Sequence, residues 1–120
     1  MPDCFTVRNT KNEYEDISSL IQINANGAYL AYEQCYRVGN EVHLKGCFNF
    51  NTNISTNTIT KFGMLPYAPN IDMRFPCTGN PHNNYTVYAA RCMIGADGSI
   101  AFQSGTACRE FAVSIDYRLE

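Results

Sequence analysis

The segment from residue 41 to residue 50 alternates between apolar and polar side chains. One parity carries Val42, Leu44, Gly46, Phe48 and Phe50, and the other carries Glu41, His43, Lys45, Cys47 and Asn49. Successive side chains of a strand point to opposite faces, so this pattern predicts a β-strand with one buried face. The alternation of Phe111, Val113, Ile115 and Tyr117 predicts a second strand of the same kind. Two such strands require a sheet whose apolar face is covered by another layer.

The residues before this strand predict a hairpin. Tyr32, Tyr36 and Val38 share one parity, opposite Glu33, Cys35 and Arg37, and Gly39-Asn40-Glu41 follows as a turn. If both apolar faces point the same way, Val38 lies across from Val42 and the connection has three residues. Tyr36 then pairs with Leu44, and Tyr32 with Phe48.

Further short strands are expected along the chain. Residues 21–25 fit a strand ending at the turn Asn24–Gly27, although Ile17, Leu20 and Ile21 also fit one helical turn. Residues 58–65 fit a strand with Ile59 and Phe62 or Leu65 inward, and residues 72–75 fit a short edge strand before a polar loop at 77–84. Residues 85–94 and 100–102 fit two strands joined by a turn at Ala96–Ser99, where Asp-Gly tolerates positive φ at both central positions.

This pattern predicts an all-β fold, an antiparallel β-sandwich of jelly-roll-like form. Aromatic residues make up 12% of the chain, which favours half-buried strands. We expect one domain at residues 21–120. Residues 1–20 are expected to be an N-terminal segment, either a linker or an added strand that Phe5 and Val7 could start.

The charge of the chain excludes several classes of function. A net charge of −2 gives no basic excess to neutralise phosphates or to hold an anionic membrane. No apolar run approaches the ~20 residues of a membrane span, and the polar start Met1–Cys4 shows no secretory signal. We therefore expect no nucleic-acid partner and no membrane insertion.

The six cysteines are expected to be free thiols. Cys4, Cys35, Cys47, Cys77, Cys92 and Cys108 include no closely spaced pair of the kind that zinc sites use. The predicted hairpin places Cys35 and Cys47 on a diagonal too long for a disulfide, and the lack of a visible signal favours a reducing compartment. Cys92 is expected to be a small buried apolar residue. Neither a metal nor a cofactor is expected.

Enzymatic motifs are not evident in the sequence. There is no G-x-S-x-G elbow and no glycine-rich phosphate loop before a helix. His43 is expected on the solvent face of its strand and His82 in a loop, while Asp97 is explained by its turn. A small hydrolase remains as an alternative, which would need a cleft holding a Cys–His or carboxylate pair.

Two polar loops, at residues 51–58 and 78–85, suggest a binding surface instead. Amide and hydroxyl groups match the hydrogen-bonding groups of sugars, and aromatic rings can cover the C–H face of a sugar ring. The candidate saccharide-binding residues are Tyr67, Asp72, Arg74, His82, Asn83, Asn84 and Tyr85. Alternatively, these Asn-rich segments are only solvated turns.

The order of several motifs resembles a known family. The run Tyr36–Gly46 (YRVGNEVHLKG) is followed by Leu65-Pro66, by Pro69, by the Asp97-Gly98 hairpin and by a final strand at 113–117. This order resembles the C-terminal head domain of receptor-binding proteins from the tail fibre or baseplate tip of phages that infect Gram-positive bacteria. The chain departs from that pattern in its many cysteines and in its lack of Trp.

The resemblance implies a specific role. Such heads form homotrimers at the tail tip of the virion, are assembled in the bacterial host cytoplasm, and bind host surface glycans. Other tail or baseplate proteins would be further partners. The alternative from another class is a structural virion module, such as a capsid decoration or fibre-assembly domain without glycan binding.

Overall fold

The computed structural model describes residues 14–81 and 84–119, and shows an all-β fold. Its elements are β1 (Tyr14–Asp16), the 3-10 helix η1 (Ser18–Leu20), β2 (Gln22–Ile23), β3 (Gly27–Ala31), β4 (Tyr36–Val38), β5 (Glu41–Phe50), β6 (Thr60–Met64), β7 (Met73–Asn80), β8 (Tyr88–Ile94), β9 (Ser99–Ser104) and β10 (Glu110–Arg118). Within the described residues, no helix is long and apolar enough to cross a membrane.

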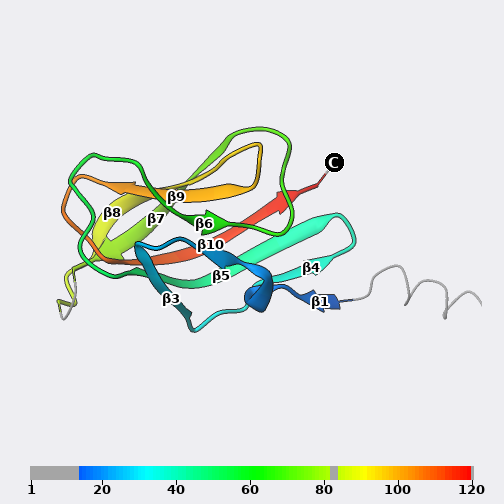
Figure 1. Ribbon diagram of the computed structural model, residues 1–120, viewed down its shortest axis with the longest axis horizontal. Helices are drawn as coiled ribbons and strands as arrows, with labels where there is room; N and C mark the ends of the chain where they lie inside the picture. The colour runs from blue at the N-terminus through cyan, green and yellow to red at the C-terminus, as the bar shows by residue number, and fades with distance from the viewer. Residues whose placement is uncertain (1–13, 82–83, 120) are drawn as a thin grey trace, which may run out of the picture.

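All of the strand pairings are antiparallel. The strands follow the order β1-β4-β5-β10-β7-β8-β9-β6-β2, and β3 pairs with β5 beside this path. The sheet curls so that the layer with β6, β8 and β9 covers the layer with β4, β5 and β10 (Figure 1). The predicted sandwich-like, antiparallel architecture is therefore confirmed.

Five phenylalanines from both layers fill the interior: Phe48, Phe50, Phe62, Phe102 and Phe111. The Phe48 and Phe62 rings meet edge to face with centroids 5.1 Å apart, and the Phe102 and Phe111 rings stack at 4.8 Å. All five side chains are at most 1% exposed. The predicted inward faces of β5 and β10 are therefore confirmed.

The predicted register of the β4–β5 hairpin is wrong by one position. Val38 lies across from Glu41 and Tyr36 from His43, so only Gly39 and Asn40 form the connection. Gly39 adopts φ +59°, which allows this tight turn. Arg37 lies across from Val42 and therefore shares the inner side of the hairpin.

The ring contacts of Tyr36 explain the reversed face of β4. Its ring stacks between the Tyr14 ring, at 5.0 Å, and the His43 ring, at 4.7 Å, on the outer face of the sheet. Tyr32 is 92% exposed, and Leu30 instead lies across from Phe48. The interior stays intact because β5 presents the expected residues to it.

The prediction for β7 is right for its first half and wrong for its second. A strand begins at Met73 as expected, but residues 77–80 extend it instead of forming a loop, and residues 78–80 lie between β10 and β8. β10 pairs with only Thr78, Gly79 and Asn80 of β7. Pro76 lies outside that pairing, so its missing N–H interrupts no ladder on the β10 side.

Other expectations differ in detail. Phe62 and Leu65 are buried as predicted, but Ile59 is 56% exposed. The Ala96–Ser99 turn joins β8 to β9 as predicted, but only Gly98 has positive φ, at +94°. Gly95 N–H donates to Ser99 O at 2.8 Å, so three residues form the loop.

The N-terminal segment contributes to the sheet in its described part. β1 pairs with β4, and Ile17 is fully buried. The expected helical turn and the expected strand are both present, as η1 followed by β2. β2 lies so close to β6 that a Cβ on Gly63 would come within 1.8 Å of Gln22 O. The expectation of a strand at Phe5 and Val7 falls outside the described residues.

Candidate functional site

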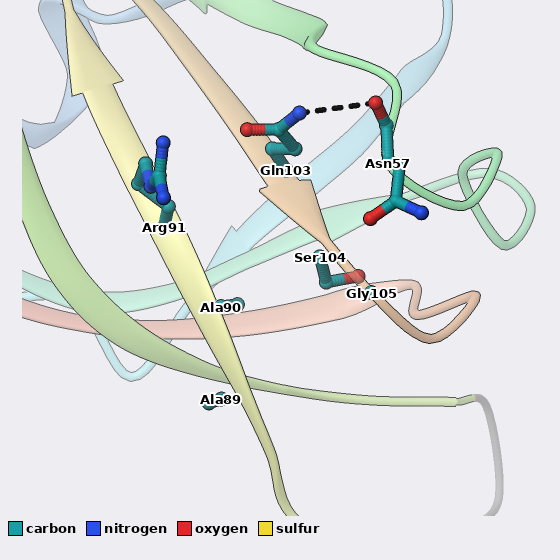
Figure 2. A pocket seen from close by; sticks show the side chains of 7 residues that line it. All are labelled: Asn57, Ala89, Ala90, Arg91, Gln103, Ser104 and Gly105. Carbon is teal, nitrogen blue, oxygen red and sulfur yellow. Dashed lines mark hydrogen bonds between the residues drawn. The ribbon is translucent and has the colours of Figure 1, made fainter.

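A polar pocket of ≈ 350 Å³ opens at the ends of β8 and β9, beside the loop that connects β5 to β6 (Figure 2). Seven residues line it: Asn57, Ala89, Ala90, Arg91, Gln103, Ser104 and Gly105. Its volume is at the lower end of the range for small-ligand sites. We call it the β8–β9 pocket.

The register of the β8–β9 hairpin places the two long polar side chains of this pocket, Arg91 and Gln103, next to each other. Arg91 and Gln103 are directly opposed partners of β8 and β9. Their neighbours Cys92 and Phe102 are also opposed and are fully buried, so Arg91 and Gln103 project from the outer face. The alternation that points Cys92 and Phe102 into the core therefore also places Arg91 and Gln103 at the pocket.

Asn57 forms the lip of the pocket and is held by its backbone. Its N–H donates to Ser104 O at 2.8 Å, and its carbonyl accepts from Gln103 Nε2 at 3.0 Å, as Figure 2 shows. It adopts φ +59°, a conformation that Asn tolerates better than most residues. The loop is anchored further back by Ile54, which is 6% exposed and donates its N–H to Cys108 O.

The charge of the pocket is positive and unbalanced. No acidic residue lines it, and within the described part of the chain no ion pair is formed by Arg91. The small residues Ala89, Ala90 and Gly105 also line it. The pocket thus offers guanidinium donors beside small residues.

The predicted residues Tyr67, Asp72 and Arg74 lie at the other end of the β7–β8 hairpin. The Tyr67 hydroxyl donates to Glu15 Oε1 at 2.8 Å, and the Arg37 guanidinium lies 4.4 Å from the centre of its ring. Asp72 Oδ1 accepts from Ala96 N–H at 2.9 Å. Arg74 is exposed on β7. Tyr67 and Asp72 are therefore engaged in structural contacts, whereas Arg74 is open to solvent.

Asn84 and Tyr85 lie beyond the opposite end of β7. Asn84 O accepts from Asn80 Nδ2 at 3.1 Å, and its side chain accepts from Thr86 N–H. Tyr85 is 96% exposed. β7 has eight residues, which span about 25 Å at the usual rise, so within one chain Asn84 and Tyr85 lie far from Asp72 and Arg74. His82 and Asn83 lie outside the described residues.

His43 forms a different polar cluster, on the outer face of β5. Its Nδ1 lies 2.5 Å from Asp116 Oδ1 and its Nε2 lies 3.3 Å from Glu41 Oε1. Arg118 also contacts Glu41, at 3.2 Å. Both ring nitrogens therefore face carboxylates, and no described thiol or hydroxyl is hydrogen-bonded to the imidazole. No group of described residues is placed to hold a metal.

The five described cysteines are free thiols, and three of them are fully buried: Cys35, Cys92 and Cys108. Burial raises the pKa of Cys77 to about 12, and it raises the pKa of Cys92 further. Such thiols remain protonated at neutral pH and pack as small apolar side chains. The expectation that Cys92 is buried is confirmed. Cys4 lies outside the described residues.

Comparison with protein-family models and with curated proteins found no match. A search of solved structures found the head domain of the lactococcal phage bIL170, described with the receptor-binding domains of lactococcal phages. The TM-score is 0.67 at 14% sequence identity, and the match covers 90% of this chain and 98% of the phage domain. The chain therefore has the fold of a phage receptor-binding head domain.

Proposed function

We propose that this protein is the receptor-binding head of a phage, which attaches the virion to a saccharide on the host cell surface. The observation that carries this proposal is the structural match, because it spans nearly the whole of a known head domain. The motif order in the sequence leads to the same family independently. The domain would be located at the tail tip, after assembly in the host cytoplasm.

The surface chemistry supports a saccharide as the receptor. The long β5–β6 loop is polar and mostly exposed, and the β8–β9 pocket beside it is lined by amide and guanidinium groups. Such groups donate to and accept from sugar hydroxyls. Arg74 and the exposed Tyr85 ring remain additional candidates for glycan contacts.

A homotrimer would strengthen this attachment. Three heads on one fibre engage a repetitive glycan together, so weak single-site affinities combine into a large avidity. Sedimentation of the purified domain tests this assembly, because a trimer has three times the 13.5 kDa mass of the chain. Other tail or baseplate proteins would bind the same trimer from its opposite end.

The test of the function is attachment to cells. Fluorescently labelled protein is mixed with intact lactococcal cells and with other Gram-positive strains, before and after periodate oxidation of their surface sugars. We expect binding to some strains, lost after periodate but not after protease treatment. Absence of binding to any strain, with tight capture of another tail protein, would favour the alternative of a structural virion module.

Variants at the two solvent-exposed candidate residues give the first map of the contact. Arg74→Ala and Tyr85→Ala both change side chains that lie on the surface. If they contact the glycan, cell binding falls while the melting temperature stays the same. Unchanged binding in both variants would remove these residues from the proposed site.

A further inference from the structure

We infer that the β8–β9 pocket binds two adjacent hydroxyls of a neutral sugar, with Arg91 as the donor and Gln103 Oε1 as the acceptor. This inference deepens the proposed function and rests on it. The inferred ligand contacts, Arg91 and Gln103, are not among the saccharide-binding candidates taken from the sequence. Both residues belong to a single chain.

The orientation of the Gln103 amide is fixed by its neighbour. A carbonyl oxygen only accepts hydrogen bonds, so the group 3.0 Å from Asn57 O is the Nε2 donor and not Oε1. Oε1 is then the group that remains for a ligand, and it is an acceptor. The same bond holds the loop at Asn57 against β9, which keeps the lip of the pocket in place.

Arg91 supplies the opposite chemistry at the adjacent position. As the cross-strand partner of Gln103, its Cβ lies about 5 Å from that of Gln103. Its guanidinium carries donors only, and it has no ion pair among the described residues. The pocket therefore presents a donor and an acceptor side by side (Figure 2).

This pair of groups matches a hydroxyl better than an anion. A hydroxyl both donates and accepts, so one of two adjacent hydroxyls donates to Gln103 Oε1 while the other accepts from Arg91. A carboxylate or phosphate would accept from Arg91, but its oxygens have no proton to offer to Gln103 Oε1. The pocket of ≈ 350 Å³ is lined beside these groups by the small residues Ala89 and Gly105, which leave room for the carbons that carry the diol.

The direct test measures sugar binding to the purified domain. Side-chain NMR signals of Arg91 and Gln103 are followed while methyl mannoside, methyl galactoside or methyl rhamnoside is added. Sugars lacking one hydroxyl of the diol and a sugar phosphate are titrated in parallel. We expect both signals to move with at least one neutral glycoside, and about tenfold weaker binding for its deoxy analogue, which corresponds to ~1.4 kcal/mol.

Variants separate the pocket from the general function. Arg91→Ala and Gln103→Met remove the donor and the acceptor. Arg118→Ala serves as the control, because it removes an exposed arginine at the end of β10 that does not line the pocket. We expect the two pocket variants to weaken sugar and cell binding about tenfold or more, and the control to bind as the wild type does. Gln103→Met also removes the hydrogen bond to Asn57 O, so its melting temperature is measured to check that it still folds. Arg91→Ala leaves that hydrogen bond in place.

The possible failures are distinguishable. Wild-type binding to cells with unaltered binding by both pocket variants would overturn the pocket assignment and leave the receptor-binding function standing. A preference for the sugar phosphate would overturn the neutral-diol assignment. If wild-type protein binds no cell, the proposed function itself fails.

Discussion

The β8–β9 and β4–β5 hairpins use aromatic residues in opposite ways. In the β8–β9 hairpin, Phe102 points inward and lies across from Cys92, and both are fully buried. In the β4–β5 hairpin, Tyr36 points outward and lies across from His43, where its ring stacks on two neighbours. The same alternation thus describes a core strand in one hairpin and a solvent-facing aromatic stack in the other.

This difference shows that parity alone does not identify the buried face of a short strand. β9 pairs with β8 so that Ile100 and Phe102 are fully buried, which fixes the face of this strand. β4 has three residues, and its outer neighbours are aromatic. Its register is therefore set by the turn at Gly39 rather than by hydrophobic burial.

The largest predicted effect contrasts the two aromatic residues. Phe102→Ala should lower the free energy of unfolding by about 3–5 kcal/mol, because it leaves a cavity among four packed rings. Tyr36→Ala should cost about 1 kcal/mol, because it removes only a surface stack. Urea unfolding of both variants measures this difference, and equal losses would contradict the contrast.

The next effect concerns the two turn glycines. Gly98→Ala should cost about 2 kcal/mol, because φ +94° strains an L-residue and the new Cβ would lie 3.3 Å from Leu65 O. Gly39→Ala should cost about 1 kcal/mol, because φ +59° is the left-handed region and no atom lies within 4 Å.

Asparagine provides the control for the turn prediction. Gly39→Asn should be better tolerated than Gly39→Ala, because Asn adopts left-handed backbone more readily. Thermal unfolding of the three variants gives the order. A larger loss at Gly39 than at Gly98 would show that the β4–β5 turn is the more constrained of the two.

A smaller effect is expected at the charge cluster beside Tyr36. Both nitrogens of His43 face carboxylate oxygens, one on Glu41 and one on Asp116. Asp116→Asn should lower stability by less than ~1 kcal/mol, because the Asp116 side chain is 64% exposed. Chemical denaturation with and without about 1 M salt checks this, since screening should remove most of the loss. A salt-independent loss would indicate a packing effect instead.

The smallest effect concerns Asp97 in the β8–β9 turn. The Ser99 backbone N–H and hydroxyl hold the pKa of the Asp97 carboxyl below its usual value. A carboxyl whose pKa is lowered by folding stabilises the fold above its unfolded value, near 3.9, and loses this contribution as the pH falls through the folded value.

Hydrogen exchange of the Ser99 amide measures this contribution. Its protection should fall as the pH is lowered below about 4 in the wild type. The same pH dependence should be absent from Asp97→Asn. An identical acid response in the two proteins would show that another carboxyl controls the turn.

Much of the fold could be predicted from the sequence because long alternating strands fix their buried face. β5 and β10 each extend over nine residues or more, and every position of their inner parity except Gly46 is buried. The second half of β7 could not be predicted, because Pro76 and Gly79 are atypical of a central strand. Pro76 is accommodated because β10 pairs only with residues 78–80, and the sequence of β7 does not show where that pairing ends.

The candidate pocket was missed for a simpler reason. The Asn-rich composition of the loops points to Asn84 and Tyr85, whereas Arg91 and Gln103 lie on strands. Arg91 and Gln103 are equally spaced from Asp97, so a three-residue loop centred on Asp97 pairs them. The position of Asn57 next to Gln103, in contrast, could be learned only from the folded structure.

The β5–β6 loop is secured by very few of its own side chains. Ile54 is buried, and backbone groups hold Asn57, while the remaining side chains from Asn51 to Ile59 are exposed. Most of these positions could therefore be exchanged without disturbing the interior. Sequence change in this loop is thus expected to alter the surface of the molecule while the scaffold is preserved.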